Sequence, residues 1–355
     1  MEQLEKIQAY LGAELKEMNE IISSTLHTSN HLMNTIVTSY LEKKGKQIRP
    51  ILVILSAKLF GRVNEDVLQA GAALEMLHNA SLIHDDVVDD TSLRRELPTI
   101  NATWGNHIAV LVGDYFVSNA LAAGIKTGHI SIISALSALG KELSLGEIDQ
   151  ICNVRDHHFD EERYFTMIRK KTASLFMNCV KMGAEATGAT PDQVAPMIRY
   201  AELLGLCFQI KDDIFDYFSN SQIGKPTGND LREGKVTLPL LYALRTAPSA
   251  EAKRMKDFIL KGELDPEHIN ILIEFAKANG GIDYAFDTMR RMQTEADDII
   301  NVYPDSEPLR YFRKIFEFII SRDKGASPSE KTRNSATHDL WRISSPMETL
   351  CMIFR

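Results

Sequence analysis

The chain has 355 residues, of which 44% are hydrophobic and 25% are charged, a composition that is typical of soluble globular proteins and excludes disordered and fibrous classes. Its formal net charge of −8 has the wrong sign for a broad basic face that binds a phosphate backbone. We therefore do not expect nucleic acid as a partner. The four cysteines are spread singly along the chain, which predicts a reducing compartment and a cytoplasmic location.

Helical periodicity begins at the first residues. Charged and apolar positions alternate over residues 1–20, which predicts an amphipathic helix and neither a signal peptide nor a transit peptide. The apolar stretch 108–125 is interrupted by Asp114, so we expect a buried helix and no membrane anchor. Further along the chain, Thr190 and Asp265 each precede a proline and predict helix starts. Because apolar residues recur three and four positions apart throughout, we predict an all-α fold with roughly a dozen helices.

Two of the predicted loops are unusual. Residues 91–105 and 219–235 are longer than a connection between helices requires, and both are rich in charge, so we expect functional residues in them. The segment 325–355 loses helical periodicity and shifts towards Ser, Thr and Arg. We therefore assign residues 1–324 to one continuous helical domain and expect the remainder to be a disordered tail or an expression-derived extension.

Two clusters of aspartates end apolar helical segments. The first cluster is Asp85, Asp86 and Asp89, and the second is Asp212, Asp213 and Asp216. In a helix, positions i and i+4 share a face, so the carboxylates within each cluster converge and repel one another unless a cation neutralises them. Their oxygens suit Mg²⁺ together with a substrate phosphate. A solvated acidic helix end is the alternative for one such cluster, but the repetition of the pattern favours two metal-binding clusters that face one diphosphate.

With these clusters in place, the sequence resembles the trans-prenyltransferases, the polyprenyl diphosphate synthases of long-chain type, from about residue 30 to residue 322. The motifs that carry the resemblance are Gly45-Lys46-Gln47-Ile48-Arg49-Pro50, Asp85 to Asp89 followed by Arg94-Arg95, Lys171-Thr172, Phe208-Gln209 before the second cluster, and the loop from Gly224 to Lys235. The resemblance implies a single-domain helical bundle of the isoprenoid synthase type with a central substrate cavity, and a homodimer.

The resemblance also implies substrates and roles. Isopentenyl diphosphate would be bound by Gly45, Lys46, Arg49, His78 and Arg95, and the allylic prenyl diphosphate by Arg94, Lys171, Lys225 and Lys235. Lys171, Lys225 and Lys235 would act in catalysis together with Thr172 and Gln209, whose oxygens would stabilise an allylic cation. Several Mg²⁺ ions would be held by the two clusters together with the allylic diphosphate. Solvated loop charges for Lys46 and Arg49, and an ordinary helix histidine for His78, are the alternative interpretations.

The residues one helix turn before the first cluster bear on product length. In the family, a bulky aromatic residue there stops growth at about three or four isoprene units, whereas this chain has Ala80 and Ser81. One helix turn of about 5.4 Å matches roughly one prenyl unit, so we expect an open tunnel and a product of about six to ten units. Close helix packing is the alternative explanation for the two small residues. Because a product of this length is strongly apolar, we expect it to be released near a membrane.

Three other functions compete with this interpretation. A terpene cyclase shares the helical fold, but its second metal site usually has an Asn/Ser/Glu pattern. A non-catalytic partner subunit typically loses one or both aspartate motifs, and this chain keeps both. A helical Ca²⁺-binding scaffold would be expected to carry a glycine-centred ligand loop, which the sequence does not have.

Overall fold

A computed structural model describes residues 2–42, 45–94, 97–218 and 228–321 of the chain. Nearly all of this part is helical, which confirms the predicted all-α class. The helices are α1 (Glu2–Tyr10), α2 (Gly12–Leu26), α3 (His31–Leu41), α4 (Ile48–Phe60), α5 (Glu65–Val88), α6 (Ile100–Trp104), α7 (Asn106–Lys126), α8 (Ile130–Arg155), α9 (Glu161–Ile168), a π-helical turn η1 (Arg169–Ala173), α10 (Ser174–Glu185), α11 (Pro191–Phe215), α12 (Asn229–Arg232), α13 (Leu238–Thr246), α14 (Ser249–Leu260), α15 (Pro266–Ala278), α16 (Gly281–Ile300) and α17 (Glu307–Ser321). Two short strands, β1 (Leu93–Arg94) and β2 (Leu97–Pro98), form an antiparallel hairpin.

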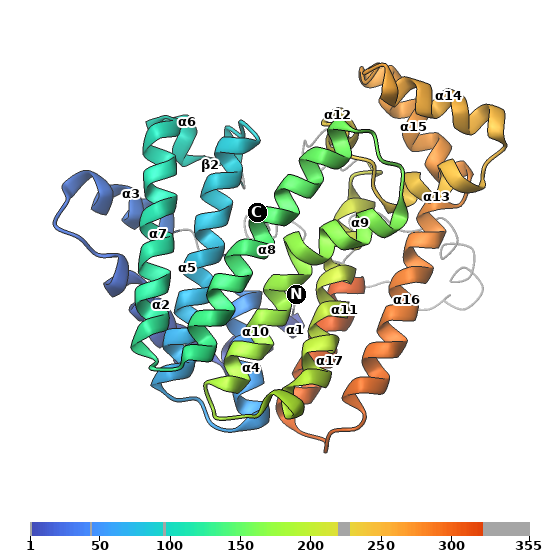
Figure 1. Cartoon of the computed structure of the whole chain (residues 1–355). Helices are drawn as coiled ribbons and strands as arrows, with labels where there is room; N and C mark the ends of the chain where they lie inside the picture. The colour runs from blue at the N-terminus through green and yellow to red at the C-terminus, as the bar shows by residue number, and fades with distance from the viewer. Residues whose placement is uncertain (1, 43–44, 95–96, 219–227, 322–355) are drawn as a thin grey trace, which may run out of the picture.

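The long helices run side by side in a bundle (Figure 1). Helix α5 packs along α7, and α10 lies in the interior, where it contacts α4, α5, α8 and α11. The approach of α10 to α4 is close because the buried Ser56 hydroxyl donates a hydrogen bond to the Val180 carbonyl oxygen over 2.7 Å. Tyr200 ties α11 to α17 in the same way, through a 2.8 Å hydrogen bond to the Phe312 carbonyl oxygen. Burial of apolar side chains along these contacts is the main source of stability.

The ends of the helices follow the capping signals of the sequence. The side chain of Gln193 accepts a hydrogen bond from the Thr190 backbone N–H, and the Asp265 carboxylate accepts from the backbone N–H groups of Glu267 and His268. Both predicted helix starts are therefore confirmed. The segment 91–105, which we predicted to be a loop, instead holds the β1–β2 hairpin and the short helix α6. Strands of two residues are too short to produce a detectable period-two pattern.

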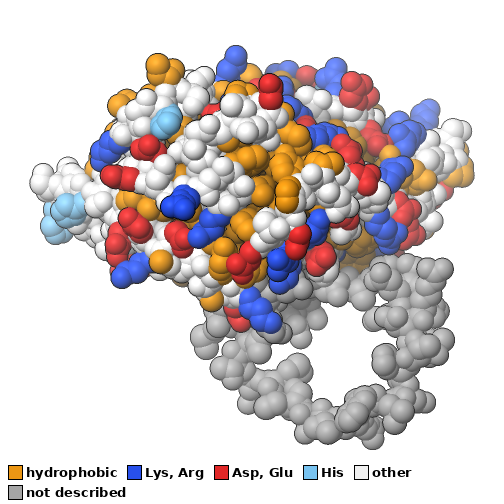
Figure 2. All heavy atoms as spheres, turned by 90° about the horizontal axis from the view of Figure 1, so that it is seen from below, with side chains coloured by type: hydrophobic (Ala, Val, Ile, Leu, Met, Phe, Trp, Pro, Cys, Tyr) orange, Lys and Arg blue, Asp and Glu red, His pale blue; other side chains and the backbone are white. Residues whose placement is uncertain are grey.

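A smaller apolar cluster lies beside the main core. It joins α12, α13, α14 and α15 around residues such as Leu240, Leu272 and Ala276, all fully buried. These helices form the upper right corner of the molecule in Figure 1. The tail 325–355 lies outside the described residues. On the face shown in Figure 2, acidic and basic side chains are intermingled around a central band of apolar ones.

The contact between α4 and α10 gives a direct test of the packing. A Cβ atom added to Gly183 would lie 2.3 Å from the Val53 carbonyl oxygen, whereas one added to Gly140 in α8 would meet nothing within 4 Å. We expect Gly183→Ala to lower the free energy of unfolding by about 1–3 kcal/mol through overpacking. Gly140→Ala should raise it by about 0.5–1 kcal/mol, because alanine favours helix. Denaturant unfolding of the two variants measures the difference, and equal effects would contradict the packing described.

Candidate active site at two aspartate-bearing helix ends

The two aspartate clusters occupy equivalent places on two helices. Asp85 and Asp86 lie in the last turn of α5, with Asp89 at its C-cap, and the second cluster repeats this arrangement at the end of α11. The carbonyl groups at a helix C-terminus already carry a partial negative charge. The three carboxylates at each of these helix ends add their negative charge to that of the carbonyl groups. Each helix end therefore attracts cations.

The Asp85 carboxyl group is affected by burial and, to a smaller extent, by repulsion from nearby negative charges. Burial is the main cause that raises the pKa of its carboxyl from 3.8 to about 6. The Lys171 ammonium opposes the shift, and the negative charges of Glu147 and Asp89 add to it. A carboxylate in this setting gains from a neighbouring cation, which fits the donor chemistry of a Mg²⁺ site.

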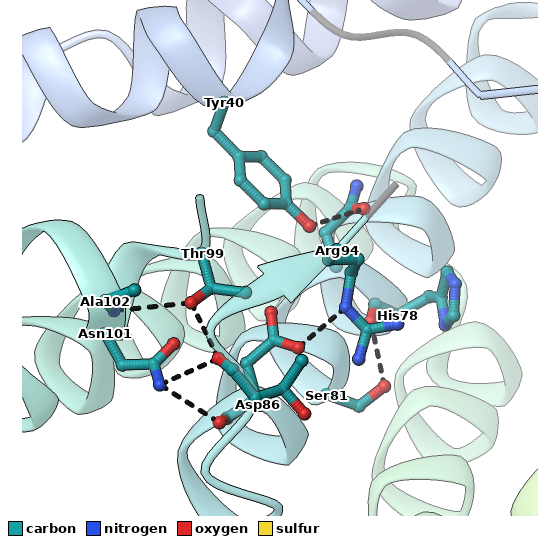
Figure 3. Close-up of polar contacts among 10 residues, drawn as sticks. Tyr40, His78, Ser81, Asp86, Arg94, Thr99, Asn101 and Ala102 are labelled. Atoms are coloured by element: carbon teal, nitrogen blue, oxygen red, sulfur yellow. Dashed lines mark hydrogen bonds and ion pairs between the residues drawn. The ribbon is translucent and has the colours of Figure 1, made fainter. Parts of the chain in front are cut away.

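Asp86 is engaged by the protein itself. Its buried carboxylate accepts a 2.7 Å hydrogen bond from Arg94 Nε, and Figure 3 shows the Arg94 side chain reaching from the hairpin towards it. The Asn101 side-chain amide of α6 donates to the carbonyl oxygens of Asp86 and Thr91, each over 3.1 Å. The Thr99 hydroxyl also donates to the Thr91 carbonyl oxygen, over 2.8 Å. The end of α5, the hairpin and α6 are thereby joined into one unit that orients Arg94.

The second cluster is engaged in a similar way. The two oxygens of Asp213 accept hydrogen bonds from the Tyr164 hydroxyl and the Gln209 side-chain amide, over 2.6 and 2.8 Å. Burial raises the pKa of the Asp213 carboxyl well above its ordinary value and Asp230 adds to the rise, while these two donors lower it. The two oxygens of Asp216 accept from the backbone N–H groups of Asn229 and Asp230, over 3.0 and 2.9 Å. Asp216 thus fixes the start of α12, and Asp212 lies half-buried beside them.

The Lys171-Thr172 pair lies on the π-helical turn η1. Lys171 Nζ is 2.5 Å from a Glu147 carboxylate oxygen and donates to the Gln150 side-chain oxygen over 3.0 Å, both on α8. The turn is held between two glycines. A Cβ added to Gly146 would lie 2.7 Å from the Lys171 nitrogen, and one added to Gly205 would lie 2.6 Å from the Ala173 Cα. The backbone of the turn therefore packs directly against the backbones of α8 and α11, and these contacts fix its position between the two helices.

Lys235 links the two halves of the site. Burial lowers the pKa of its ammonium, but the hydrogen-bonded Glu233 carboxylate, with further contributions from Asp89 and Asp230, raises it overall. The charge of Asp89 thus acts on Lys235, although α5 and this segment are far apart in the sequence. Asp230 itself is shifted to a pKa of about 6, mainly by burial and by the charge of Asp216. Lys235 is therefore influenced by Asp89 of the first cluster and by Asp230, which lies next to the second.

A cavity of about 180 Å³ lies beside Lys235, and of the two clusters only the second contributes an aspartate, Asp213, to its lining among the described residues. Its lining brings together, among others, Gln150, Tyr164, Lys171, Thr172, Gln209, Asp213, Asp230 and Lys235. Five of these had been predicted from the sequence as site residues. Gln150, Tyr164 and Asp230 had not, nor had Glu147 beside Lys171. Asp230 lies in a predicted charged loop, which was a usable signal, whereas a single tyrosine or glutamate on an amphipathic helix carries none.

Three of the residues predicted to bind isopentenyl diphosphate, Gly45, Lys46 and Arg49, lie around the start of α4. Lys46 precedes the helix, with its ammonium 5.5 Å from the centre of the Phe318 ring, and Arg49 lies in the first turn. Gly45 lies half-buried next to Lys46, and His78 is buried in α5. The remaining predicted residues, Arg95 and Lys225, fall outside the described part of the chain.

The two small residues of the predicted chain-length site lie inside the bundle. Ala80 is fully buried in α5, and Ser81 is half-buried with its hydroxyl donating to the His78 carbonyl oxygen over 2.8 Å (Figure 3). Both lie on the helix that carries the first aspartate cluster, between one and two turns before it.

The helical fold and the paired aspartate clusters define a trans-prenyltransferase. The family model described as Polyprenyl synthetase matches residues 30–275. Octaprenyl diphosphate synthase of Haemophilus influenzae is 32% identical over 305 residues, which are 86% of this chain and 92% of that protein. The chain therefore belongs to the polyprenyl synthetase family and is a prenyltransferase.

Solved structures agree with this assignment. The structure of geranylgeranyl pyrophosphate synthase from Bacteroides thetaiotaomicron is 38% identical, with a TM-score of 0.78 over 91% of this chain and 100% of that one. Polyprenyl synthase from Caulobacter crescentus, described as complexed with calcium and isoprenyl diphosphate, is 27% identical, with a TM-score of 0.83 over 90% of this chain and 98% of that one. The predicted resemblance to trans-prenyltransferases is thus confirmed.

The raised pKa of Asp85, about 6 against an ordinary 3.8, predicts an effect on stability. Between these values the folded protein binds more protons than the unfolded chain, so ionised Asp85 destabilises the metal-free fold as pH rises through this range. We expect Asp85→Asn to raise the melting temperature of the metal-free protein at pH 7, and to leave it unchanged below about pH 3, where both states are protonated. Thermal unfolding with a chelator present measures this, and a lower melting temperature at pH 7 would contradict the site's electrostatics.

Proposed function

We propose that the protein condenses isopentenyl diphosphate with an allylic prenyl diphosphate in a Mg²⁺-dependent, head-to-tail reaction that forms a long-chain all-trans polyprenyl diphosphate and releases diphosphate. The observation that carries the proposal is that Lys171 and Lys235 line one cavity with Asp213 of the second cluster, while the charges of these two lysines also interact with Asp85 and Asp89 of the first cluster. Negative clusters on opposite sides suit metal ions that share a diphosphate, and lysines between them suit its remaining charge.

Metal binding is assigned to the two clusters, Asp85, Asp86, Asp89, Asp212, Asp213 and Asp216. The hydrogen bonds that Asp86, Asp213 and Asp216 accept from the protein fix the orientation of these three carboxylates within the clusters. When bound, several Mg²⁺ ions would supply the positive charge that makes diphosphate a good leaving group.

The residues of the chain have separable tasks in this reaction. Lys171 exchanges its ion pair with Glu147 for the allylic diphosphate, and Arg94, Lys225 and Lys235 add positive charge to it. The allylic C–O bond breaks, and its electron pair leaves with the diphosphate. The oxygens of Thr172 and Gln209 face the resulting allylic cation.

The second substrate is held on the other side of the cation. Isopentenyl diphosphate is bound by Gly45, Lys46 and Arg49 at the start of α4, where the backbone N–H groups of the helix also favour an anion, and the resemblance adds His78 of α5 and Arg95 to this set. Its double bond attacks the cation and forms the new C–C bond. A proton is then lost to the departing diphosphate, which restores the double bond, and the longer allylic product can re-enter the cycle.

Control of product length is assigned to Ala80 and Ser81, which we call the wall of α5 because they would line the space for the growing product. Ala80 and Ser81 leave little side chain next to the growing product, which supports about six to ten units at roughly one unit per helix turn. An octaprenyl synthase relative agrees with this range. A geranylgeranyl pyrophosphate synthase of similar fold, which makes a shorter product by its name, defines the alternative outcome.

A homodimer is the quaternary structure that we propose. Helix α7 is apolar and long enough to cross a membrane by length and composition, yet 39% of its most apolar window is buried in the fold. Leu111 and Ile125 on α7 are 58% and 61% exposed, and Ile130 at the start of α8 is 83% exposed. A second copy of the chain would cover this face, as an apolar patch of this kind requires.

We place the protein in the cytoplasm, with product release near a membrane.

The reaction is tested by incubating the protein with farnesyl diphosphate, excess isopentenyl diphosphate and Mg²⁺, followed by chromatography of the dephosphorylated products. We expect a ladder that ends at about six to ten units and disappears with chelator. No elongation from any allylic starter would contradict the proposed function and favour a non-catalytic partner subunit.

The same assay tests the role of α5. We expect Ala80→Phe to shorten the product to about three or four units while the first condensation continues, because the aromatic ring fills the space next to the chain. Ala123→Phe, at a buried position on the neighbouring helix α7, is a control for general disruption of packing. If Ala80→Phe left the product length of the folded protein unchanged, the assignment of the wall would be wrong.

The exposed face of α7 predicts a dimer in solution. We expect light scattering to give twice the mass of the chain, and the double variant Leu111→Glu and Ile125→Glu to give a monomer, because charges cannot be buried there without partners. Val302→Glu, at a position 75% exposed elsewhere on the molecule, should remain dimeric. A dimer that survives the double substitution would place the interface on another face.

A further inference from the structure

A continuous series of hydrogen bonds runs from helix α9 to the π-helical turn. The Tyr164 hydroxyl donates to Asp213 over 2.6 Å, the Gln209 side-chain amide donates to the other Asp213 oxygen over 2.8 Å, and the Thr172 hydroxyl donates to the Gln209 side-chain oxygen over 2.7 Å. We propose that Tyr164 is a positioning residue, which acts through Asp213 and Gln209 to fix the direction of the Thr172 hydroxyl. The inference rests on the proposed function.

The direction of each hydrogen bond follows from the donors available. The ionised form of Asp213, which a metal-binding cluster requires, offers only acceptors, so Asp213 accepts the hydroxyl proton of Tyr164 and faces the NH₂ group of Gln209. The carbonyl oxygen of the same amide is then turned towards Thr172. A carbonyl oxygen can only accept, so the Thr172 hydroxyl proton points at Gln209. The lone pairs of the Thr172 oxygen are left for the cavity.

This direction matters for the chemistry assigned to Thr172. Tyr164, Thr172, Gln209 and Asp213 all line the same cavity. An oxygen that presents its lone pairs stabilises a developing allylic cation, whereas a hydroxyl that presents its proton destabilises the cation. Because the direction is set before the substrate enters, the hydroxyl need not reorient during the reaction.

The surroundings of Tyr164 restrict its movement, so its hydroxyl can keep the hydrogen-bonded series in one arrangement. Its side chain is 2% exposed, and its ring packs edge-on against Phe165 with the ring centres 5.4 Å apart. Helix α9 is itself fixed at its start, where the Asp160 carboxylate accepts from the Arg163 backbone N–H over 2.8 Å. At the other end of the series, the glycine contacts of η1 fix the backbone of Thr172. Removal of the Tyr164 hydroxyl would leave one Asp213 oxygen without this donor and allow the Gln209 amide to turn.

The experiment is a double-mutant cycle on the full chain. Tyr164→Phe, Thr172→Val and the combined variant are compared with the unmodified protein in steady-state condensation of farnesyl diphosphate and isopentenyl diphosphate with Mg²⁺. We expect Tyr164→Phe to lower kcat about ten-fold to a hundred-fold with the KM for isopentenyl diphosphate unchanged. In the Thr172→Val background the same change should alter kcat by less than about two-fold, because the group it orients is absent.

Tyr200→Phe is the matched control. Tyr200 is a buried tyrosine of α11 with one hydrogen bond, to the Phe312 carbonyl oxygen, at a contact with α17. Its loss should lower the melting temperature about as much as Tyr164→Phe does, with kcat unchanged. If Tyr164→Phe fails to fold, Gln209→Leu interrupts the same series at its next member. Because the Gln209 oxygen is also assigned to face the cation, this change should still lower kcat in the Thr172→Val background, but by a smaller factor than in the unmodified protein.

Three results would overturn the inference. Independent, multiplicative losses in kcat would show that Tyr164 does not act through Thr172. A loss in Tyr200→Phe equal to that in Tyr164→Phe would indicate a general effect of a buried hydroxyl. Full activity of Tyr164→Phe would show that the direction of the hydroxyl does not depend on it. These results require an active unmodified protein, so they are distinct from the absence of any condensation, which would overturn the proposed function and this inference together.

Discussion

The structure depends on an electrostatic conflict at the ends of α5 and α11. Each helix ends in three aspartates at the position where its dipole disfavours negative charge. The fold relieves this only in part, through Arg94 on Asp86, backbone N–H groups on Asp216, and Tyr164 with Gln209 on Asp213. The pKa of Asp85 is raised to about 6, mainly by burial and further by the charges of Glu147 and Asp89. Under the proposed function, stability and activity are therefore opposed at this residue, because the charge that weakens the free fold would be the charge that binds a cation.

Much of this arrangement was predictable because it rests on local patterns. The spacing of apolar residues predicted the helices, and Thr190 and Asp265 predicted two helix starts. The two aspartate clusters predicted the helix ends that form the candidate site. These features depend on contacts between residues fewer than five positions apart in the chain. The motifs around Lys171 and Gln209 were recognised from their order, and the structure lines one cavity with both residues.

The rest could not be predicted because it depends on contacts between distant segments. The pairing of Lys171 with Glu147 joins α8 to η1, and the hydrogen bond of Tyr164 to Asp213 joins α9 to α11. Nothing in the local sequence of Glu147 or Tyr164 distinguishes it from other residues on amphipathic helices. The π-helical turn is a similar case. It is held by close contact with glycines of two other helices, so its cause lies outside its own five residues.

The separation between the wall of α5 and the hydrogen-bonded series of η1 and α11 bears on how this protein can evolve. Ala80 and Ser81 belong to one helix, whereas Thr172, Gln209 and their supporting residues belong to others. Under the roles proposed above, a substitution of Ala80 or Ser81 would alter the space next to the product without moving Thr172 or Gln209. Selection on product size and selection on bond-breaking would then act on different residues. A lineage could change the length of its product through few substitutions on α5, provided that the aspartates at the end of the same helix keep their positions.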